Sequence, residues 1–470
     1  MRTVKKGLLL FSAQITDTVL ILLRNMILAR LLSVEQFGVA ATFTILMTLI
    51  DATQNAGLNR MIIQAKDGDS ERVQNSLHAA QFILGLLSSA IILVISLPYS
   101  VLMRTPDLFW AYLVFSLMPL VRSLGHLDTF RLQRRERFGP SIVRLLVPQV
   151  TSLLLIWPMH FFFSDYRLAL VSLVSYHVLT MLMSHLGAER RYRFEFDRDV
   201  LMRARSFGWP ILINGSLMFV LMNGDRIIVS NQFGAFVLGG FSAAFLIAMM
   251  PPTILSRTLL SMFLPKLARD QGDDARFTAM YEYTVYFTTF LAVGLVAGAG
   301  IFGELAMTLI FGAKYQDASA YLALIVVMQS LRLIRAAPTV AAMAKAETRN
   351  PLYSNLVRIV FIPLSFLAAV MLDNIWIMLA VGVVGEVVAA IAVSAFARKS
   401  IGLEQRAYLL SLIGSLAAMG SVMLFTLAGW HWAIMLPGHA LFVLTIWPGV
   451  RIVADRGMQT IRRRVGRPLP

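Results

Sequence analysis

Arginine and acidic side chains occur inside long apolar stretches of this sequence, where charged groups are rare. The arginines within such stretches are Arg24, Arg30, Arg60, Arg122, Arg144, Arg226, Arg257, Arg332, Arg335 and Arg358. The acidic residues there are only Asp17, Asp51, Asp128, Asp225 and Glu386. Guanidinium groups bind phosphate and carboxylate bidentately and do not lose their charge at physiological pH. This excess of positive charge therefore favours an anionic ligand.

The stretch 7–32 shows how these polar residues are arranged. It is long enough to cross a bilayer, which takes about 20 apolar residues. At 100° per residue, its polar side chains share one face of a helix; they are Gln14, Asp17, Thr18, Arg24 and Asn25. A similar stripe in the next stretch consists of Thr44, Thr48, Asp51, Asn55 and Asn59. A charged face at membrane depth must meet a water-filled cavity or polar partners, so we expect both helices to line a cavity.

Depth within the stretches separates candidate ligand groups from structural ones. Arg24, Arg122, Arg332 and Arg335 lie deepest, and an arginine at the bilayer centre costs at least about 2.5 kcal/mol. We therefore predict that these four bind the substrate. Asp17 and Asp51 either neutralise Arg24 or carry protons or cations, and the sequence leaves both readings open.

The remaining arginines of the apolar stretches have simpler interpretations. Arg30 and its counterpart Arg226 are expected to be structural. Four others lie near one end of their stretches, where a long side chain can extend to the membrane surface; they are Arg60, Arg144, Arg257 and Arg358.

The composition is that of an integral membrane protein. Hydrophobic residues make up 57% of the 470 residues, charged residues only 14%, and the mean hydropathy is +0.71. Soluble proteins carry about 25% charged residues. Cysteine is absent, which excludes disulfides and thiolate metal sites.

The apolar stretches predict an all-α protein with about fourteen transmembrane helices. They are 7–32, 37–63, 75–103, 107–130, 141–163, 166–188, 206–231, 235–263, 280–303, 317–342, 353–372, 375–397, 408–429 and 433–450. If the N-terminus is cytoplasmic, only Arg104, Arg167 and Lys314 of the 42 Lys and Arg residues lie in loops on the opposite side. This asymmetry predicts cytoplasmic N- and C-termini. It also explains the net charge of +16 without a nucleic-acid partner, although the basic loops could contact membrane lipids.

A short repeat indicates two homologous halves. Residues 30–38 read RLLSVEQFG and residues 226–234 read RIIVSNQFG, and each copy precedes a second apolar stretch. Many transporters are built from such repeats. We predict a six-helix bundle over 1–188, a basic cytoplasmic linker over 189–205, a second six-helix bundle over 206–397, and two extra helices with a basic tail over 398–470. The two pseudo-symmetric bundles are expected to surround a central cavity.

Signatures of enzymes are missing from the sequence. There is no GxxxxGK[ST] nucleotide loop, no HExxH metal pair and no GxSxG elbow, and no loop is long enough to hold a separate active site. We therefore expect no catalytic residues, no cofactor and no metal.

Several motifs resemble those of the polysaccharide flippases of the Wzx type. They are the 30–38 turn, the Asp225-Arg226-Ile-Ile start of its second copy, the segment Leu309-Ile-Phe-Gly-Ala-Lys-Tyr and the small-residue run 341–349. These flippases belong to a superfamily that also contains the lipid II flippase and the multidrug and toxin extruders. The resemblance covers essentially the whole chain. It implies two bundles around a central cavity that opens alternately to each side.

The resemblance also implies a function. Such a protein moves a polyprenyl-diphosphate-linked oligosaccharide, an O-antigen or exopolysaccharide repeat unit, from the cytoplasmic to the periplasmic leaflet of a bacterial inner membrane, where polymerase or export machinery could receive it. The excess of arginine fits this anionic lipid-linked substrate. The alternatives are a cation-coupled multidrug exporter, which needs a cavity attractive to cations, a lipid II flippase, and a membrane glycosyltransferase, which needs an acidic catalytic pair that the sequence does not show.

Overall fold

The computed structural model describes residues 2–347 and 349–449, so the basic tail expected at 451–470 lies outside the described residues. The chain divides into two compact units, 1–242 and 243–470. In the described residues, eleven helices are long and apolar enough to cross a membrane, or up to twelve if a bent pair is one span. The prediction of an all-α membrane protein is confirmed. The predicted domain bounds stay a prediction.

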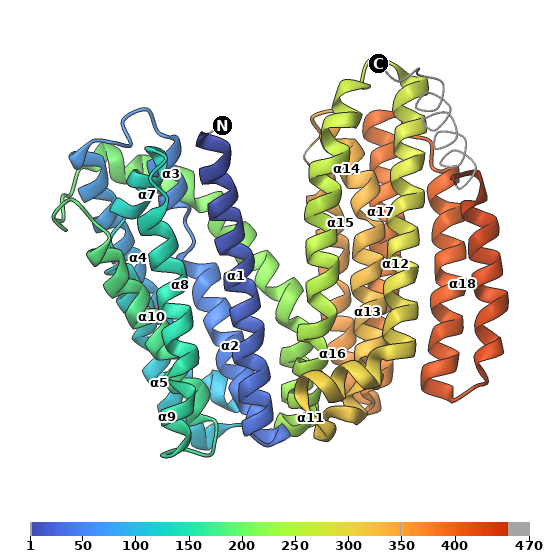
Figure 1. The fold of residues 1–470 in the computed structure, drawn as a ribbon, viewed down its shortest axis with the longest axis horizontal. Coiled ribbons are helices and arrows are strands. Elements are labelled where there is room, and N and C mark those ends of the chain that lie inside the picture. Colours follow the sequence, from blue (N-terminus) through green and yellow to red (C-terminus); the bar gives the residue numbers. More distant parts are fainter. Residues whose placement is uncertain (1, 348, 450–470) are drawn as a thin grey trace, which may run out of the picture. The chain divides into compact units, whose positions relative to one another are not determined.

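The first unit is built from ten helices and the first part of an eleventh (Figure 1). They are α1 (Arg2–Leu31), α2 (Val34–Gln54), α3 (Leu58–Gln64), α4 (Glu71–Leu102), α5 (Phe109–Ser116), α6 (Met118–Ser123), α7 (Asp128–Arg134), α8 (Gly139–Leu154), α9 (Ile156–His160), α10 (Arg167–Leu186) and the beginning of α11 (Arg198–Arg269).

The second unit begins inside α11 and contains the remaining described helices (Figure 1). They are α12 (Asp274–Phe311), α13 (Ser319–Ile334), α14 (Ala336–Ala344), α15 (Asn350–Ile359), α16 (Phe361–Leu372), α17 (Ile375–Ile401) and α18 (Arg406–Ala428). A last apolar segment, Trp432–Gly449, follows α18.

Two of the predicted transmembrane stretches are joined in α11. This helix has 72 residues, which at 1.5 Å per residue is far longer than the bilayer core of about 30 Å. Its backbone leaves the helical region at Gly234, with φ 80° and ψ −178°, a conformation that glycine adopts at low cost. The break lies between the predicted stretches 206–231 and 235–263, so α11 contains both.

The first copy of the repeat packs against the part of α11 that follows the second copy, inside the first unit. A Cβ atom on Gly38 would lie 1.8 Å from the carbonyl oxygen of Ala235, and one on Gly239 would lie 2.0 Å from that of Val34. The backbones of α2 and α11 can approach this closely only because both positions are glycine. The contact fixes α2, and with it the polar stripe that contains Asp51.

A buried aromatic core also holds α2 in place. Phe43 packs against Tyr112 and Phe115, with ring centroids 5.6 and 5.2 Å away. The hydroxyl of Tyr99 donates a hydrogen bond of 2.7 Å to the carbonyl of Thr42. These contacts join α2 to α4 and α5 over the part of α2 that precedes Asp51.

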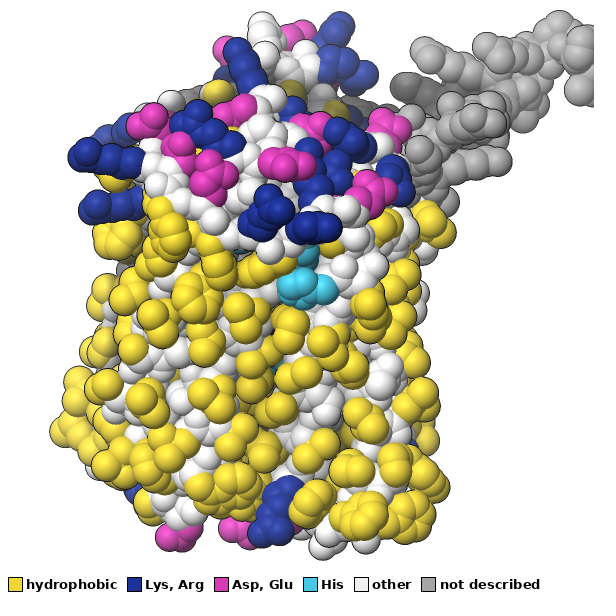
Figure 2. All heavy atoms as spheres, turned by 90° about the vertical axis from the view of Figure 1, so that its left-hand side faces the viewer, with side chains coloured by type: hydrophobic (Ala, Val, Ile, Leu, Met, Phe, Trp, Pro, Cys, Tyr) yellow, Lys and Arg dark blue, Asp and Glu magenta, His cyan; other side chains and the backbone are white. Residues whose placement is uncertain are grey.

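The surface of the first unit matches a bilayer environment. Figure 2 shows a broad band of hydrophobic side chains between two ends that carry charged side chains, with more charged residues at one end. Along α4, Leu87, Ile91 and Val94 are 56%, 52% and 75% exposed. Apolar residues so exposed on a helix of 32 residues are expected to face lipid.

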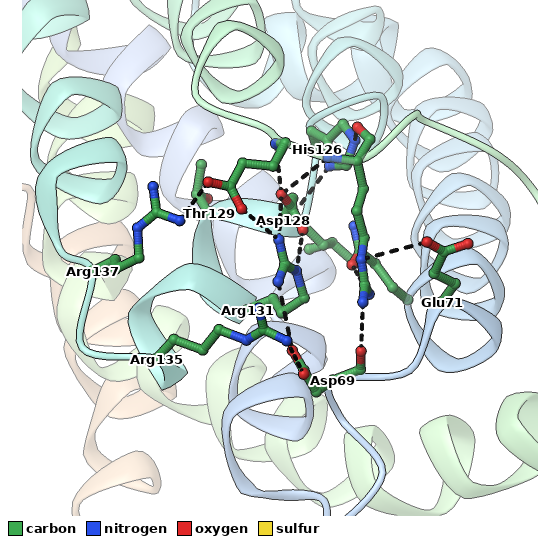
Figure 3. A network of polar contacts seen from close by, with 12 residues as sticks. Asp69, Glu71, His126, Asp128, Thr129, Arg131, Arg135 and Arg137 are labelled. Atoms are coloured by element: carbon green, nitrogen blue, oxygen red, sulfur yellow. Dashed lines mark hydrogen bonds and ion pairs between the residues drawn. The ribbon is translucent and has the colours of Figure 1, made fainter.

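A network of ion pairs ties the linker after α10 to the charged end of the first unit (Figure 3). Arg131 of α7 donates to Asp128 through two hydrogen bonds and also to Glu189 of the linker. The side chain of Asp128 accepts a 2.8 Å hydrogen bond from the backbone N–H of Glu189. Arg137 pairs with Glu189 and lowers the pKa of that carboxyl group. The linker thus has a defined path along the first unit.

Candidate functional site

The predicted site residues of the second unit meet at one buried glutamate. Arg332 and Arg335 come from the end of α13, and Glu386 lies in the middle of α17 with no exposed surface. The Nε atom of Arg332 lies 2.6 Å from Oε1 of Glu386, and a terminal nitrogen of Arg335 lies 3.5 Å from Oε2. Arg358 of α15 pairs with the same Oε1 atom.

This cluster has more positive than negative charge. Three guanidinium groups surround one carboxylate, which leaves two positive charges in excess. The side chains of Arg332 and Arg335 are 13% and 11% exposed, whereas Arg358 is 6% exposed. Neighbouring polar groups orient the first two: Arg332 donates to the Gln329 amide oxygen at 3.0 Å, and Arg335 donates to the Ser354 hydroxyl at 2.8 Å. The Nε atom of Arg335 is buried and has no hydrogen-bond partner among the described residues.

The position of Arg358 corrects a sequence-based expectation. We expected this side chain to extend to the membrane surface, but it is buried against Glu386. The physical reason is that α15 and α17 pack side by side, which brings the Glu386 carboxylate into contact with Arg358. Sequence reasoning also assigned no role to Glu386, although an acid inside an apolar stretch was a visible signal.

Two of the predicted site residues of the first unit, Asp51 and Arg122, line one space together with Tyr176 of α10. Arg122, at the end of α6, forms an ion pair with Asp51 of α2. Of the six residues predicted from sequence, four lie in the first unit and two in the second.

The two aspartates of the first unit differ in their contacts. Asp51 pairs with Arg122 rather than with Arg24, and its side chain is 56% exposed. One carboxylate oxygen of Asp17 is buried without a hydrogen-bond partner among the described residues. Arg24 is 8% exposed, and within the described part of the chain no carboxylate forms an ion pair with it at 4.0 Å or less. Neither aspartate therefore neutralises Arg24 by direct contact.

A polar cavity of about 550 Å³ opens beside this group and lies entirely within the first unit. Its lining includes Asp51, Arg122, Arg144, Tyr176 and His177. This volume lies in the range of about 300–1,000 Å³ that is typical of small-molecule sites.

Arg144 belongs to this cavity, although we expected it to extend to the membrane surface. Its guanidinium group donates to the Thr129 hydroxyl at 3.2 Å and lies over the Phe130 ring, 4.7 Å from the centroid. The aromatic contact holds the charge without a carboxylate. Arg144 therefore adds to the positive charge around the cavity.

Two glutamine side chains that line the cavity form hydrogen bonds with carbonyl groups at the ends of α6. The amide nitrogen of Gln81 donates to the carbonyl oxygens of Ser123 and Gly125, at 2.7 and 3.0 Å. The amide nitrogen of Gln54 donates to the carbonyl of Pro119 at 2.6 Å. These bonds satisfy backbone groups at the ends of the short helix α6, so they fix the position of Arg122.

The motifs of the sequence and the fold agree with known proteins. A family described as "Polysaccharide biosynthesis protein" matches residues 27–320. The chain belongs to this family. Its resemblance to the polysaccharide flippases is thereby confirmed, and it is a multi-pass membrane protein.

Relatives of this family member include bacterial proteins that are named for polysaccharide biosynthesis. It is 21% identical to an uncharacterized membrane protein of the cps region of Klebsiella pneumoniae, over 79% of this chain and 77% of that one. It is 22% identical to the lipopolysaccharide biosynthesis protein WzxC of Escherichia coli, over 83% and 80%. It is also 22% identical to the succinoglycan biosynthesis transport protein ExoT of Rhizobium meliloti, over 65% and 62%.

Solved structures with the same fold are transporters. The lipid II flippase MurJ in an inward closed conformation matches 96% of this chain and 100% of its own, with a TM-score of 0.68 and 12% identity. An inward-facing multidrug transporter of the MATE family matches 82% and 94%, with a TM-score of 0.67 and 16% identity. At these identities the likeness concerns the fold alone.

Proposed function

We propose that this protein is a flippase that moves a polyprenyl-diphosphate-linked oligosaccharide from the cytoplasmic to the periplasmic leaflet by alternating access. The observation that carries the proposal is the cluster of three arginines around Glu386, with two positive charges in excess and two guanidinium groups partly exposed. Names of the relatives that refer to succinoglycan transport and lipopolysaccharide biosynthesis support the same class of substrate.

The two groups of site residues would have related roles. A diphosphate offers several oxygen atoms, and the planar guanidinium group binds such oxygens bidentately. Arg332 and Arg335 in the second unit would bind the diphosphate or acidic sugars, and Arg24 and Arg122 in the first unit would bind the same kinds of group. The reaction is a movement between leaflets, so no bond is formed or broken and no catalytic residue is needed.

The charged end of the first unit gives the proposed orientation. The ion-pair network of Figure 3 includes Arg131, Arg135 and Arg137, and basic loops prefer the cytoplasm. This end would face the cytoplasm, where the lipid-linked sugar is assembled, and a polysaccharide polymerase or export machinery would take the product on the other side.

A transport experiment tests the proposal against multidrug export. We expect purified protein in liposomes to transfer a polyprenyl-diphosphate-linked oligosaccharide between leaflets and not to move a cationic dye. The reason is that excess guanidinium charge attracts anions and repels organic cations. A membrane-impermeant glycosidase measures how much oligosaccharide has reached the outer leaflet. Dye transport without oligosaccharide transfer would refute the proposal.

Asp17 is the proposed point of coupling to a proton gradient. Its buried oxygen without a hydrogen-bond partner could accept a proton without losing an ion pair. We expect Asp17→Asn to leave oligosaccharide transfer without a gradient unchanged and to remove its stimulation by a pH gradient. Asp51→Asn is the matched variant, because Asp51 is paired with Arg122. If Asp17→Asn keeps the full gradient effect, Asp17 is not the coupling group.

A further inference from the structure

An apolar groove of about 320 Å³ lies in the first unit, between α3, α4 and the beginning of α11. Its lining includes leucine and isoleucine side chains together with small residues. The small residues are Ala56, Ala80, Ala204 and Gly208. A Cβ atom on Gly208 would lie 2.9 Å from Cβ of Ala56, so α11 can approach this closely only at a glycine. Four of the residues that line the groove thus have little or no side chain.

The groove adjoins the polar cavity described above. Leu58 and Leu84 line both the groove and the cavity, so the two spaces are adjacent at these side chains. Arg205 and Trp209 stand one turn apart in α11 and line the groove. Trp209 is 64% exposed, and tryptophan with an exposed ring is typical of the membrane–water interface.

A polar atom beside the cavity lacks a hydrogen bond. The amide oxygen of Gln54 is buried and has no hydrogen-bond partner among the described residues. Buried polar groups usually have such partners, and this oxygen can accept from a hydroxyl group. The guanidinium group of Arg122, which lines the same cavity and is paired with Asp51, carries positive charge. The lining therefore matches a head group that carries both sugar hydroxyls and phosphate.

We propose that the groove holds the first isoprene units of the substrate's polyprenyl tail while its sugar-diphosphate head group occupies the adjoining cavity. This inference rests on the proposed function and adds a tail-binding site within the first unit. The polar cavity favours this occupant over a membrane phospholipid, because its volume of about 550 Å³ suits a drug-sized head group and its lining offers amides as well as arginine.

Photocrosslinking tests the groove directly. Benzoylphenylalanine replaces Ile83, which lines the groove, or Val94, which is 75% exposed further along the same helix. The protein is reconstituted in phosphatidylglycerol liposomes that contain the polyprenyl-diphosphate-linked oligosaccharide. We expect the oligosaccharide lipid to crosslink at position 83 at least tenfold more than at position 94. Equal crosslinking at both positions, or crosslinking of phosphatidylglycerol alone at position 83, would overturn the proposal.

A blocking variant provides a second test with a matched control. Ala80→Phe fills the groove, and Ala306→Phe fills a separate apolar groove of about 250 Å³ in the second unit, which shares no lining residue with the polar cavity. We expect Ala80→Phe to reduce oligosaccharide transfer at least tenfold and to abolish crosslinking at position 83, and Ala306→Phe to change neither.

The outcomes separate this proposal from the proposed function. Wild-type transfer without crosslinking at position 83, or normal transfer by Ala80→Phe, would refute tail binding in the groove but not the proposed flippase function. Specific crosslinking at position 83 without any transfer by the wild type would support binding in the groove and refute the proposed flippase function.

Discussion

Replacing both Arg332 and Arg335 with alanine is expected to abolish polymer export while the protein stays folded in the membrane. The structure explains why the fold should survive. Glu386 keeps its ion pair with Arg358 in the double variant, so one guanidinium group still neutralises one carboxylate. The two removed charges are those in excess, which the substrate would use.

The expected size of this effect follows from the bonds that are lost. A hydrogen bond to a charged group contributes about 1.5–3 kcal/mol, and every 1.4 kcal/mol is about tenfold in affinity. The loss of two guanidinium groups should therefore reduce transport at least about a hundredfold. Export is measured as surface polysaccharide in cells that depend on this protein. Arg257→Ala is the control, because Arg257 is exposed and outside the cluster. Normal export by the double variant would remove both arginines from the site.

Replacing Glu386 with glutamine is expected to destabilise the second unit strongly. Glutamine has almost the same shape, but it leaves three buried or half-buried guanidinium groups without their carboxylate. Removing one partner of a buried ion pair costs about 3–5 kcal/mol, which is a large share of a typical unfolding free energy of about 5–15 kcal/mol. We expect little folded protein in the membrane and a lower midpoint of thermal unfolding in detergent.

Two further variants make the Glu386 experiment specific. Glu304→Gln changes an exposed glutamate that contacts Gln316, so it should be as stable as the wild type. The double variant Glu386→Gln, Arg358→Gln restores the wild-type net charge of the cluster and should recover part of the lost stability. Wild-type stability in Glu386→Gln would mean that the carboxylate does not hold the three arginines together.

The sequence was sufficient to identify the charged residues that lie within apolar transmembrane stretches, because local spacing and hydropathy alone determine them. A charged residue within an apolar stretch must have a partner or water whatever the fold. Arg332 and Arg335 are three positions apart, so a helical pattern was enough to predict that they share one face.

The partners of these residues could not be predicted, because they come from other helices. Glu386 is more than fifty positions from Arg332 in the sequence, and only the packing of α13, α15 and α17 brings three arginines to it. From the sequence, Asp51 could pair with either Arg24 or Arg122, and only the positions of α2 and α6 in the fold decide between them. The two copies of the repeat also differ in structure. The helix of the first copy is interrupted at Ser33, which caps α2, whereas that of the second is interrupted at Gly234.

The binding of substrate to the purified protein is the most direct test of the role of the excess arginine charge. The measurement is the affinity for a polyprenyl-diphosphate-linked oligosaccharide, with inorganic diphosphate as competitor, for the wild type and for the double variant Arg332→Ala, Arg335→Ala. We predict that the wild type binds, that diphosphate competes, and that the double variant binds at least about a hundredfold more weakly. Equal affinity of the two proteins, without competition by diphosphate, would contradict the assignment of these arginines to an anionic head group.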